Sequence, residues 1–288
     1  MSPFLNIAFR AAREAGNLML RSFKNLDSIR VERKAANDFV TEIDRQSERI
    51  LIEQILTAYP HHVIRAEEGG YYATQKTASG ELAIQQIDTP QKAPTHEWII
   101  DPLDGTTNYL HGLPHYAISV ALRQRGVLTN ALVFAPELND LYTAEKDNGA
   151  TLNNRRIRVA KTTRLEESLI ATGFPVVDHS VDDAYLAILK DVINQTAGAR
   201  RYGSAALDLC YVADGHFDGF FEFNLKAWDI AAGALIVKES GGYVSDFLGE
   251  EDYLTTGNIC AGNAQIHGFL LKIIQEQLKN DDLTDSAA

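Results

Sequence analysis

The chain has 288 residues, 45% of them hydrophobic, and a formal net charge of −12 at pH 7. This length and apolar fraction suffice for one large globular domain or two small ones. The acidic balance argues against direct nucleic-acid binding and against anionic membranes, since both need a basic face. With two cysteines, no signal-peptide pattern and no apolar run of membrane-spanning length, we expect a soluble cytoplasmic protein without disulfides.

The N-terminal part predicts two amphipathic helices. Apolar residues at helical spacing predict an opening helix of about five turns over residues 5–19. A second helix is expected over 41–58, where Thr41 and Asp44 form a T-x-x-D start signal. Residues 25–37 are polar without a clear period and predict a loop.

A short apolar run over residues 62–66 predicts a strand that ends in the acidic pair Glu67 and Glu68. The next segment, residues 71–97, has little periodicity and two prolines, and it is long for a loop in a compact domain. We therefore expect a mobile insertion. Because it lies between two acidic strand ends, it would cover part of the site.

A second acidic strand end is predicted within residues 98–108, which read W-I-I-D-P-L-D-G-T-T-N. The first three residues are typical of a strand buried on both faces, and Pro102 and Gly105 predict its end. Asp101 and Asp104 would then stand at the carboxyl end of a strand, where open α/β sheets bind ligands. The alternative is an ordinary Asp-Pro-Gly turn without a functional role.

The remaining chain continues to alternate between strands and helices, with no repeat and no Gly/Ser linker. We expect strands over 116–123, 127–134, 140–144, 157–159, 169–171, 217–223, 243–245 and 258–261, and helices over 182–194, 203–213, 230–239 and 266–278. This alternation favours one layered α/β domain over residues 1–288, with a frayed tail at 280–288.

Four acids stand at predicted element ends: Glu67, Asp101, Asp104 and Asp229. If they converge, their charge is unfavourable unless protons or cations neutralise it. No histidine or cysteine accompanies them, so oxygen ligation indicates Mg²⁺ or Mn²⁺. For Asp229 alone, the alternative is a carboxylate favoured by the dipole of its own helix.

Backbone N–H groups at Gly105 and Thr106 would hold phosphate oxygens at the same place. Acids, metal and anion site together indicate phosphoryl transfer. Since the chain lacks a G-x-x-x-x-G-K nucleotide loop, hydrolysis of a phosphate monoester is favoured over kinase or NTPase chemistry.

Two long motifs carry a family resemblance. W-I-I-D-P-L-D-G-T-T-N at 98–108 and W-D-I-A-A-G-A-L-I-V-K-E-S-G-G at 228–242 resemble the two signatures of the inositol monophosphatase family. N-D-F-V-T-E-I-D at 37–44 and the pair at 67–68 resemble shorter family segments in the same order. The resemblance implies an α/β (α+β) fold, the layered αβαβα sandwich of metal-dependent sugar phosphatases, and a homodimer.

The resemblance also implies a role for each matching residue. A first Mg²⁺ would be held by Glu67, Asp101 and the backbone carbonyl of Leu103, and a second by Asp101, Asp104 and Asp229. A third, weaker ion would bind near Glu67 through water. Mn²⁺ is an alternative at the same sites.

Thr106 and Asp44 would position and help deprotonate the attacking water, whose pKa the metal lowers, and Glu67 completes the implied catalytic set. For Asp44 a plain capping-box role remains equally open. Substrate would be bound by the amides of Gly105 and Thr106 and by Gly203, Ser204, Ala205, Glu222 and Asp229. The alternative for Glu222 is an exposed strand residue.

Two departures from the family pattern stand out. Gly69 follows the Glu pair where the family usually has Ser or Thr, and the 71–97 segment is longer than in close relatives. Neither removes an implied metal ligand.

The resemblance implies a lithium-sensitive, Mg²⁺-dependent phosphatase acting on inositol 1-phosphate and related small polyol phosphates. Alternatives are a fructose bisphosphatase, a 3′-nucleotidase or a histidinol-phosphatase. A reading from another class is an interaction module, since some bacterial members resembling this chain join the transcription antitermination assembly with RNA polymerase and Nus factors. The acidic composition would then favour protein over RNA as the direct partner.

Overall fold

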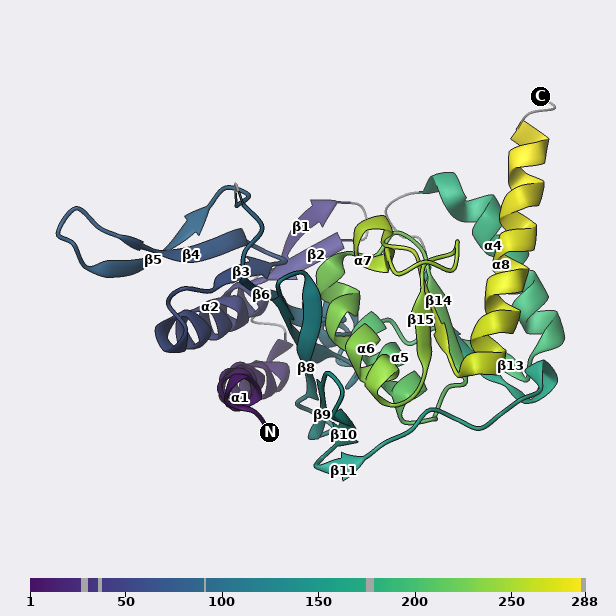
Figure 1. Cartoon of the computed structure of the whole chain (residues 1–288), viewed down its shortest axis with the longest axis horizontal. Helices are drawn as coiled ribbons and strands as arrows, with labels where there is room; N and C mark the ends of the chain where they lie inside the picture. Colours follow the sequence, from purple (N-terminus) through teal and green to yellow (C-terminus); the bar gives the residue numbers. More distant parts are fainter. Residues whose placement is uncertain (27–30, 36–37, 91, 175–178, 286–288) are drawn as a thin grey trace.

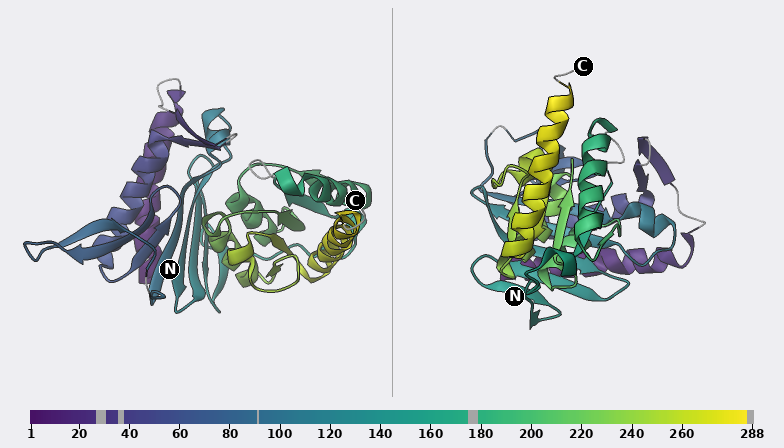
Figure 2. Two further views of the ribbon diagram at one scale, coloured as in Figure 1. Left: turned by 90° about the horizontal axis from the view of Figure 1, so that it is seen from above. Right: turned by 90° about the vertical axis from the view of Figure 1, so that its right-hand side faces the viewer.

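The computed structural model describes residues 1–26, 31–35, 38–90, 92–174 and 179–285. Its elements form five layers in the order helices, sheet, helices, sheet, helices (Figure 1). Seen from above in Figure 2, the purple helices, the teal sheet and the green and yellow C-terminal part follow one another across the view. The mixed α/β class and the layered αβαβα sandwich are confirmed.

The first layer contains α1 (Pro3–Phe23) and α2 (Glu42–Ala58), so both predicted N-terminal helices are confirmed. The Ser2 hydroxyl caps α1, and Thr41 caps α2 in a full capping box. Their apolar faces pack against one face of the large sheet and form the first hydrophobic core.

The second layer is a nine-stranded sheet in the order β11-β10-β9-β8-β7-β6-β3-β4-β5. Neighbouring strands are antiparallel except β3 and β6, which run parallel. Its strands are β3 (Val63–Ala66), β4 (Gly70–Lys76), β5 (Leu82–Ile87), β6 (His96–Asp104), β7 (Ala117–Gln124), β8 (Val127–Ala135), β9 (Asp140–Glu145), β10 (Gly149–Leu152) and β11 (Arg155–Arg156). A separate antiparallel pair consists of β1 (Val31–Ala35) and β2 (Asp38–Thr41).

The middle layer contains α5 (Ala205–Ala213) and α6 (Ala227–Glu239), which lie between the two sheets. Because α6 is covered on both sides, most of its residues are apolar and buried. The second sheet has the order β13-β12-β14-β16-β15. Its strands are β12 (Leu169–Thr172), β13 (Gly198–Arg200), β14 (Gly219–Glu222), β15 (Tyr243–Ser245) and β16 (Ile259–Gly262).

The outer layer contains α4 (Asp182–Gln195) and α8 (Ala264–Asp285), which form the third core with the small sheet. Short helical segments complete the fold: α3 (Thr106–Leu110), α7 (Tyr253–Thr256), η2 (Leu165–Glu167) and η3 (His179–Val181). Cys210 and Cys260 are buried free thiols. No helix in the described ranges is both long and apolar enough to cross a membrane.

Several predicted elements are wrong. The 71–97 segment is not a loop, because β4 and β5 form a hairpin there that continues the large sheet at its edge. The loop predicted at 25–37 contains β1 instead, while residues 27–30 and 36–37 lie outside the described part. The strand predicted at 157–159 is absent, and the chain before it forms β10 and β11.

The C-terminal prediction also needs correction. The last helix does not end at Leu278 but continues to Asp285, so most of the tail predicted to fray at 280–288 is helical. Residues 286–288 lie outside the described part of the chain. The assignment of residues 1–288 to a single domain stays a prediction.

Candidate active site

The parallel pairing of β3 and β6 brings the first two acids together. Ala66 pairs with Ile100, and the amide of Glu67 donates to the carbonyl of Ile100 at 3.2 Å. Glu67 directly follows β3 and Asp101 directly follows the β6 residue that pairs with Ala66, so the two acids lie on neighbouring strands at the same level. This is the arrangement expected at the carboxyl ends of parallel strands.

A β-bulge in β6 brings Asp104 onto the same face as Asp101. Asp101 pairs with Ser119 and Asp104 with Ala117, so β6 advances three residues while β7 advances two. Partners two residues apart on β7 share one face, and the extra residue in β6 restores that face for Asp104. The strand thus continues through Pro102, and the prediction that it ends there is wrong.

Gly105 makes the turn that follows the bulge. Its φ of 94° lies in the left-handed region, and a Cβ there would approach the carbonyl oxygen of His115 to 3.0 Å. Both facts favour glycine at this position. The turn leads directly into the short helix α3, whose Asn108 amide donates to the carbonyls of His115 and Tyr202, each at 2.8 Å. The 203–205 segment is therefore held against the end of β6.

Asp104 is bound by the start of α5. The Ser204 hydroxyl donates to its Oδ2 at 2.6 Å, and the amide of Ala206 donates to the same oxygen at 2.8 Å. The amide of Ala205 also contributes a hydrogen bond. Of the predicted substrate segment Gly203, Ser204 and Ala205, the last two are thus already engaged with an acid of the cluster.

Asp229 reaches the cluster from the first turn of α6, where the amide of Lys226 donates to its Oδ2 at 2.6 Å. The charge of Asp229 raises the pKa of Asp101. Glu222, at the end of β14, lies near enough to raise the pKa of Asp229. Its carboxylate packs on Gly173, where a Cβ would approach Oε1 to 1.8 Å. Glu222 is therefore half-buried beside the acids, not an exposed strand residue.

The electrostatics of the cluster are unfavourable in the chain alone. Burial raises the pKa of Asp101 well above its usual range, and the charges of Glu67, Asp104 and Asp229 raise it further. Burial raises the pKa of Asp104 to about 6, against its hydrogen bonds to Ser204 and Ala206. Burial and then the charge of Asp104 raise the pKa of Asp229 to about 8. The four acids thus lie close enough to repel one another.

These side chains have the chemistry of a divalent-cation site but not its finished geometry. In the described ranges, no three His, Cys, Asp or Glu side chains stand together as a ready-made metal site. The oxygen ligands available here are the carboxylates and the carbonyl of Leu103, which suit Mg²⁺ or Mn²⁺ rather than a softer metal. Mutual repulsion of the uncompensated acids is the physical reason for a cation to bind here.

Asp44 performs the capping role and also contacts the candidate site. Its Oδ2 accepts the Thr41 amide at 2.9 Å, which completes the capping box of α2. Its Oδ1 accepts the Thr106 hydroxyl at 3.0 Å, and that hydroxyl is also 3.0 Å from the carbonyl oxygen of Leu103. Burial raises the pKa of Asp44 to about 6. The two readings of Asp44 are therefore compatible.

The sequence analysis did not identify three further residues that lie near the site. Asp208 on α5 is 1% exposed, its Oδ1 has no hydrogen-bond partner, and burial followed by the charge of Asp104 raises its pKa well above the usual range. Arg201 lowers the pKa of Asp104 and stacks over the ring of Phe174. Glu48 is 3% exposed on α2. Of the three, only Asp208 lies in a segment with a sequence signal, since it belongs to the helix predicted over 203–213 and follows the predicted substrate segment 203–205.

The model of the inositol monophosphatase family matches residues 1–279. The chain belongs to this family. Among curated relatives, it is 56% identical to the putative Nus factor SuhB of Neisseria meningitidis serogroup B, over 95% of this chain and 98% of that protein. It is 43% identical to the Nus factor SuhB of Escherichia coli K12, over 97% and 98%.

Solved structures of family members share the fold. The extragenic suppressor protein suhB of Bartonella henselae superposes with a TM-score of 0.85 at 38% identity, over 95% of this chain and 98% of that one. An IMPase of Thermotoga maritima gives a TM-score of 0.81 at 34% identity, over 96% and 98%. Members of the inositol monophosphatase family are generally metal-dependent phosphatases, and this coarse class applies to the present chain.

Proposed function

We propose that this phosphatase is Mg²⁺-dependent and hydrolyses inositol 1-phosphate and related small polyol phosphates. The observation that supports this most strongly is the mutual repulsion of Asp101, Asp104 and Asp229 beside the left-handed turn at Gly105. The acids suit a hard divalent cation, and the backbone amides after the turn suit a phosphate group.

Two to three Mg²⁺ ions, or Mn²⁺ in their place, would be held by Glu67, Asp101, the carbonyl of Leu103, Asp104 and Asp229. Bound cations would balance the acids and lower the pKa of the attacking water. The chain itself contributes the Thr106 hydroxyl, which lies between Asp44 and the carbonyl of Leu103. This hydroxyl would orient the water, and Asp44 would accept its proton through Thr106, with Glu67 assisting.

The substrate would be bound at two places. The amides of Gly105 and Thr106 would receive phosphate oxygens. Glu222 and Asp229 would accept hydrogen bonds from polyol hydroxyls, as would the 203–205 segment, which also holds Asp104. Such contacts are few, so related sugar and nucleotide phosphates remain alternative substrates.

The test is phosphate release from inositol 1-phosphate by the purified protein, with Mg²⁺ and with a chelator. We expect activity only with the cation, and its loss in Asp104→Asn. Activity without divalent metal, or full activity in that variant, would contradict the proposal. A parallel panel of fructose 1,6-bisphosphate, a nucleoside 3′-phosphate and histidinol phosphate decides the substrate.

A second role is suggested by relatives at 47% and 43% identity that are named Nus factors. We propose on this basis a cytoplasmic homodimer that also joins a transcription complex through protein contacts with RNA polymerase or Nus factors. A pull-down of these partners with wild-type protein and with Asp104→Asn tests it. Binding by both proteins would separate this role from catalysis, and binding by neither would contradict it.

A further inference from the structure

The turn that follows β3 contains Glu67, Glu68 and Gly69, and its conformation sets where the Glu67 side chain points. Glu48 of α2 lies against this turn. Its Oε2 accepts the backbone N–H of Glu68 at 2.8 Å, and the amide of Gly69 also donates to its carboxylate. Since Glu48 is only 3% exposed, these are buried, charge-assisted hydrogen bonds.

Glu48 and Asp44 lie one helical turn apart on the same face of α2. Asp44 binds Thr106 after the end of β6, and Glu48 binds the turn after the end of β3. One helix face thus holds both loops that carry the candidate cation ligands. Residues that fix metal ligands in this way strongly influence metal affinity without contacting the metal.

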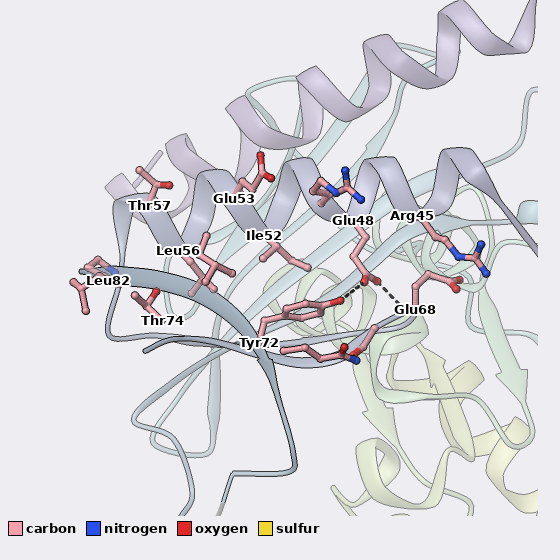
Figure 3. A pocket seen from close by; sticks show the side chains of 15 residues that line it. Arg45, Glu48, Ile52, Glu53, Leu56, Thr57, Glu68, Tyr72, Thr74 and Leu82 are labelled. Atoms are coloured by element: carbon pink, nitrogen blue, oxygen red, sulfur yellow. Dashed lines mark hydrogen bonds between the residues drawn. The ribbon is translucent and has the colours of Figure 1, made fainter. Parts of the chain in front are cut away.

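Tyr72 of β4 completes the arrangement around Gly69. Its hydroxyl lies 3.5 Å from Oε1 of Glu48, as the dashed lines in Figure 3 show. A Cβ at Gly69 would approach the Tyr72 hydroxyl to 1.8 Å and Oε1 of Glu48 to 2.9 Å. The φ of Gly69 lies outside the left-handed region, so a side chain there is opposed by space and not by backbone conformation, and it would have to displace the ends of the Tyr72 and Glu48 side chains.

Beyond this contact the hairpin stands away from the helix. A cavity of about 960 Å³ separates α2 from β4 and β5, with Ile52 and Leu56 on one side and Thr74 and Ile84 on the other (Figure 3). Glu48, Glu68, Gly69 and Tyr72 also line this cavity. From β5, Gln86 donates to the carbonyl of Gly69. The hairpin is therefore joined to the turn at the end nearest the acids.

We propose that Glu48 and Tyr72 are positioning residues that hold the 67–69 turn, and thereby Glu67, in the orientation needed to bind a divalent cation. This rests on the proposed function for the identity of Glu67 as a ligand. The proposal also connects the β4–β5 hairpin at the sheet edge to the candidate active site, through the contact of Tyr72 with Glu48 and the hydrogen bond from Gln86 to Gly69. The glycine at position 69 follows from the same arrangement, because the Tyr72 hydroxyl fills the space of its side chain.

The direct test is calorimetric titration of the purified, metal-free protein with Mn²⁺. Glu48→Ala should weaken Mn²⁺ binding by about 10–100-fold. Tyr72→Phe removes one long hydrogen bond and should weaken Mn²⁺ binding by about 2–5-fold. The matched controls are Glu53→Ala, an exposed acid on the same helix and cavity, and Tyr71→Phe, whose side chain leaves β4 on the opposite face. Both should bind Mn²⁺ as the wild type does.

Hydrogen exchange gives a readout that needs neither metal nor substrate. The amides of Glu68 and Gly69 should exchange faster in Glu48→Ala than in Glu53→Ala, because their buried acceptor is gone. Enzyme kinetics provide a further readout. The Mg²⁺ concentration for half-maximal activity should rise in Glu48→Ala and in Tyr72→Phe, while KM for the substrate stays unchanged. If Glu48→Ala does not fold, Tyr72→Phe carries the Mn²⁺ titration and the kinetic test.

A double-mutant cycle tests the packing at Gly69. Gly69→Ser alone should lower Mn²⁺ affinity, and the same change in a Tyr72→Ala background should cause little further loss.

The outcomes separate the two proposals. A wild-type protein that binds Mn²⁺ but does not hydrolyse inositol 1-phosphate overturns the proposed function and leaves the positioning role standing. A wild-type enzyme that is active, with Mn²⁺ affinity unchanged in Glu48→Ala and Tyr72→Phe, overturns the positioning role. Wild-type protein that binds no Mn²⁺ overturns both.

Discussion

Two sets of buried acids lie near the ends of β3 and β6, and their charges are compensated differently. On α2, Asp44 and Glu48 accept hydrogen bonds from backbone amides and from hydroxyl groups. At the strand ends, Asp101 accepts one amide, from Leu103, and faces three other acids. Burial raises the pKa in both sets, to about 6 for Asp44 and about 7 for Glu48.

The difference lies in where the compensating charge comes from. The α2 acids bind donors of the chain, so they hold loops in place whether or not a ligand is present. Among the strand-end acids, Asp104 and Asp229 also accept hydrogen bonds from the chain. Asp101 accepts a single amide and faces three acids, so its full compensation must come from outside the chain. Neutralising an acid should therefore have opposite effects on stability in the two sets.

The largest expected effect is on activity. Asp101→Asn removes the acid that the other three face, and we expect phosphate release to fall by about 100-fold or more. Assays at saturating Mg²⁺ measure this, with Glu53→Gln as the matched control on an exposed carboxylate. Activity within about two-fold of wild type in Asp101→Asn would remove the strand-end set from the mechanism.

The next effect is stabilisation by cation. Mg²⁺ at one hundred times its dissociation constant should raise the free energy of unfolding by about 2.7 kcal/mol, because only the folded chain gathers the acids. Thermal unfolding with Mg²⁺ and with a chelator measures the shift. The shift should be largely lost in Asp101→Asn, and an equal shift in that variant would place the bound cation elsewhere.

The comparison is tested most sharply by the sign of two substitutions without metal. Asp44→Ala removes a buried acceptor and the N3 half of the capping box of α2, and it should lower the free energy of unfolding by about 1–3 kcal/mol. Asp101→Asn relieves repulsion and should raise it. Urea denaturation in chelator gives both values. Destabilisation of similar size in both variants would show that the two sets do not differ as proposed.

A smaller effect concerns pH and a buried histidine that directly precedes β3. Nδ1 of His62 accepts the Trp98 indole N–H at 2.9 Å, so the ring must be neutral to keep this bond. Burial lowers the pKa of His62 to about 4, below the value of 6.5 for an unfolded chain. Between these values the unfolded state binds the proton that the folded state excludes, so the contribution of His62 to stability falls as pH drops from about 6.5 to 4. The buried acids with raised pKa values act in the opposite direction, because their folded forms bind protons more tightly.

Urea denaturation of the wild type and of His62→Gln between pH 7.5 and 4.5 isolates this contribution, because the free energy of unfolding of the wild type should fall, relative to that of the variant, as the pH is lowered. His115, whose pKa burial also lowers to about 4, contributes in the same direction and leaves part of the slope in that variant. A pH slope that is unchanged in His62→Gln would contradict the assignment.

Much of the fold and the list of acids could be predicted from sequence because their signals are local. The apolar face of α1, the capping signal at Thr41 and the buried run before Asp101 each lie within a few residues. The rule that ligands bind at strand carboxyl ends then indicates the part of the chain where the structure brings the acids together.

Other features depend on partners far away in the sequence. Pro102 predicts a strand end, yet the pairing with β7 accommodates it in a bulge that brings Asp101 and Asp104 onto one face. The hairpin of β4 and β5 lies at the edge of the sheet, so its residues are mostly polar or half-exposed and lack a period. Glu48 looks like any surface acid of an amphipathic helix until the 67–69 turn packs over it.

The central claim is that Glu67, Asp101, Asp104 and Asp229 share divalent cations. Anomalous diffraction from crystals soaked in Mn²⁺ tests it most directly, because the ion is located without reference to activity. We predict at least one anomalous peak in contact with the Asp101 carboxylate and with one or more of the other three acids. A crystal with Mn²⁺ bound elsewhere, or with no peak near Asp101, would contradict the account.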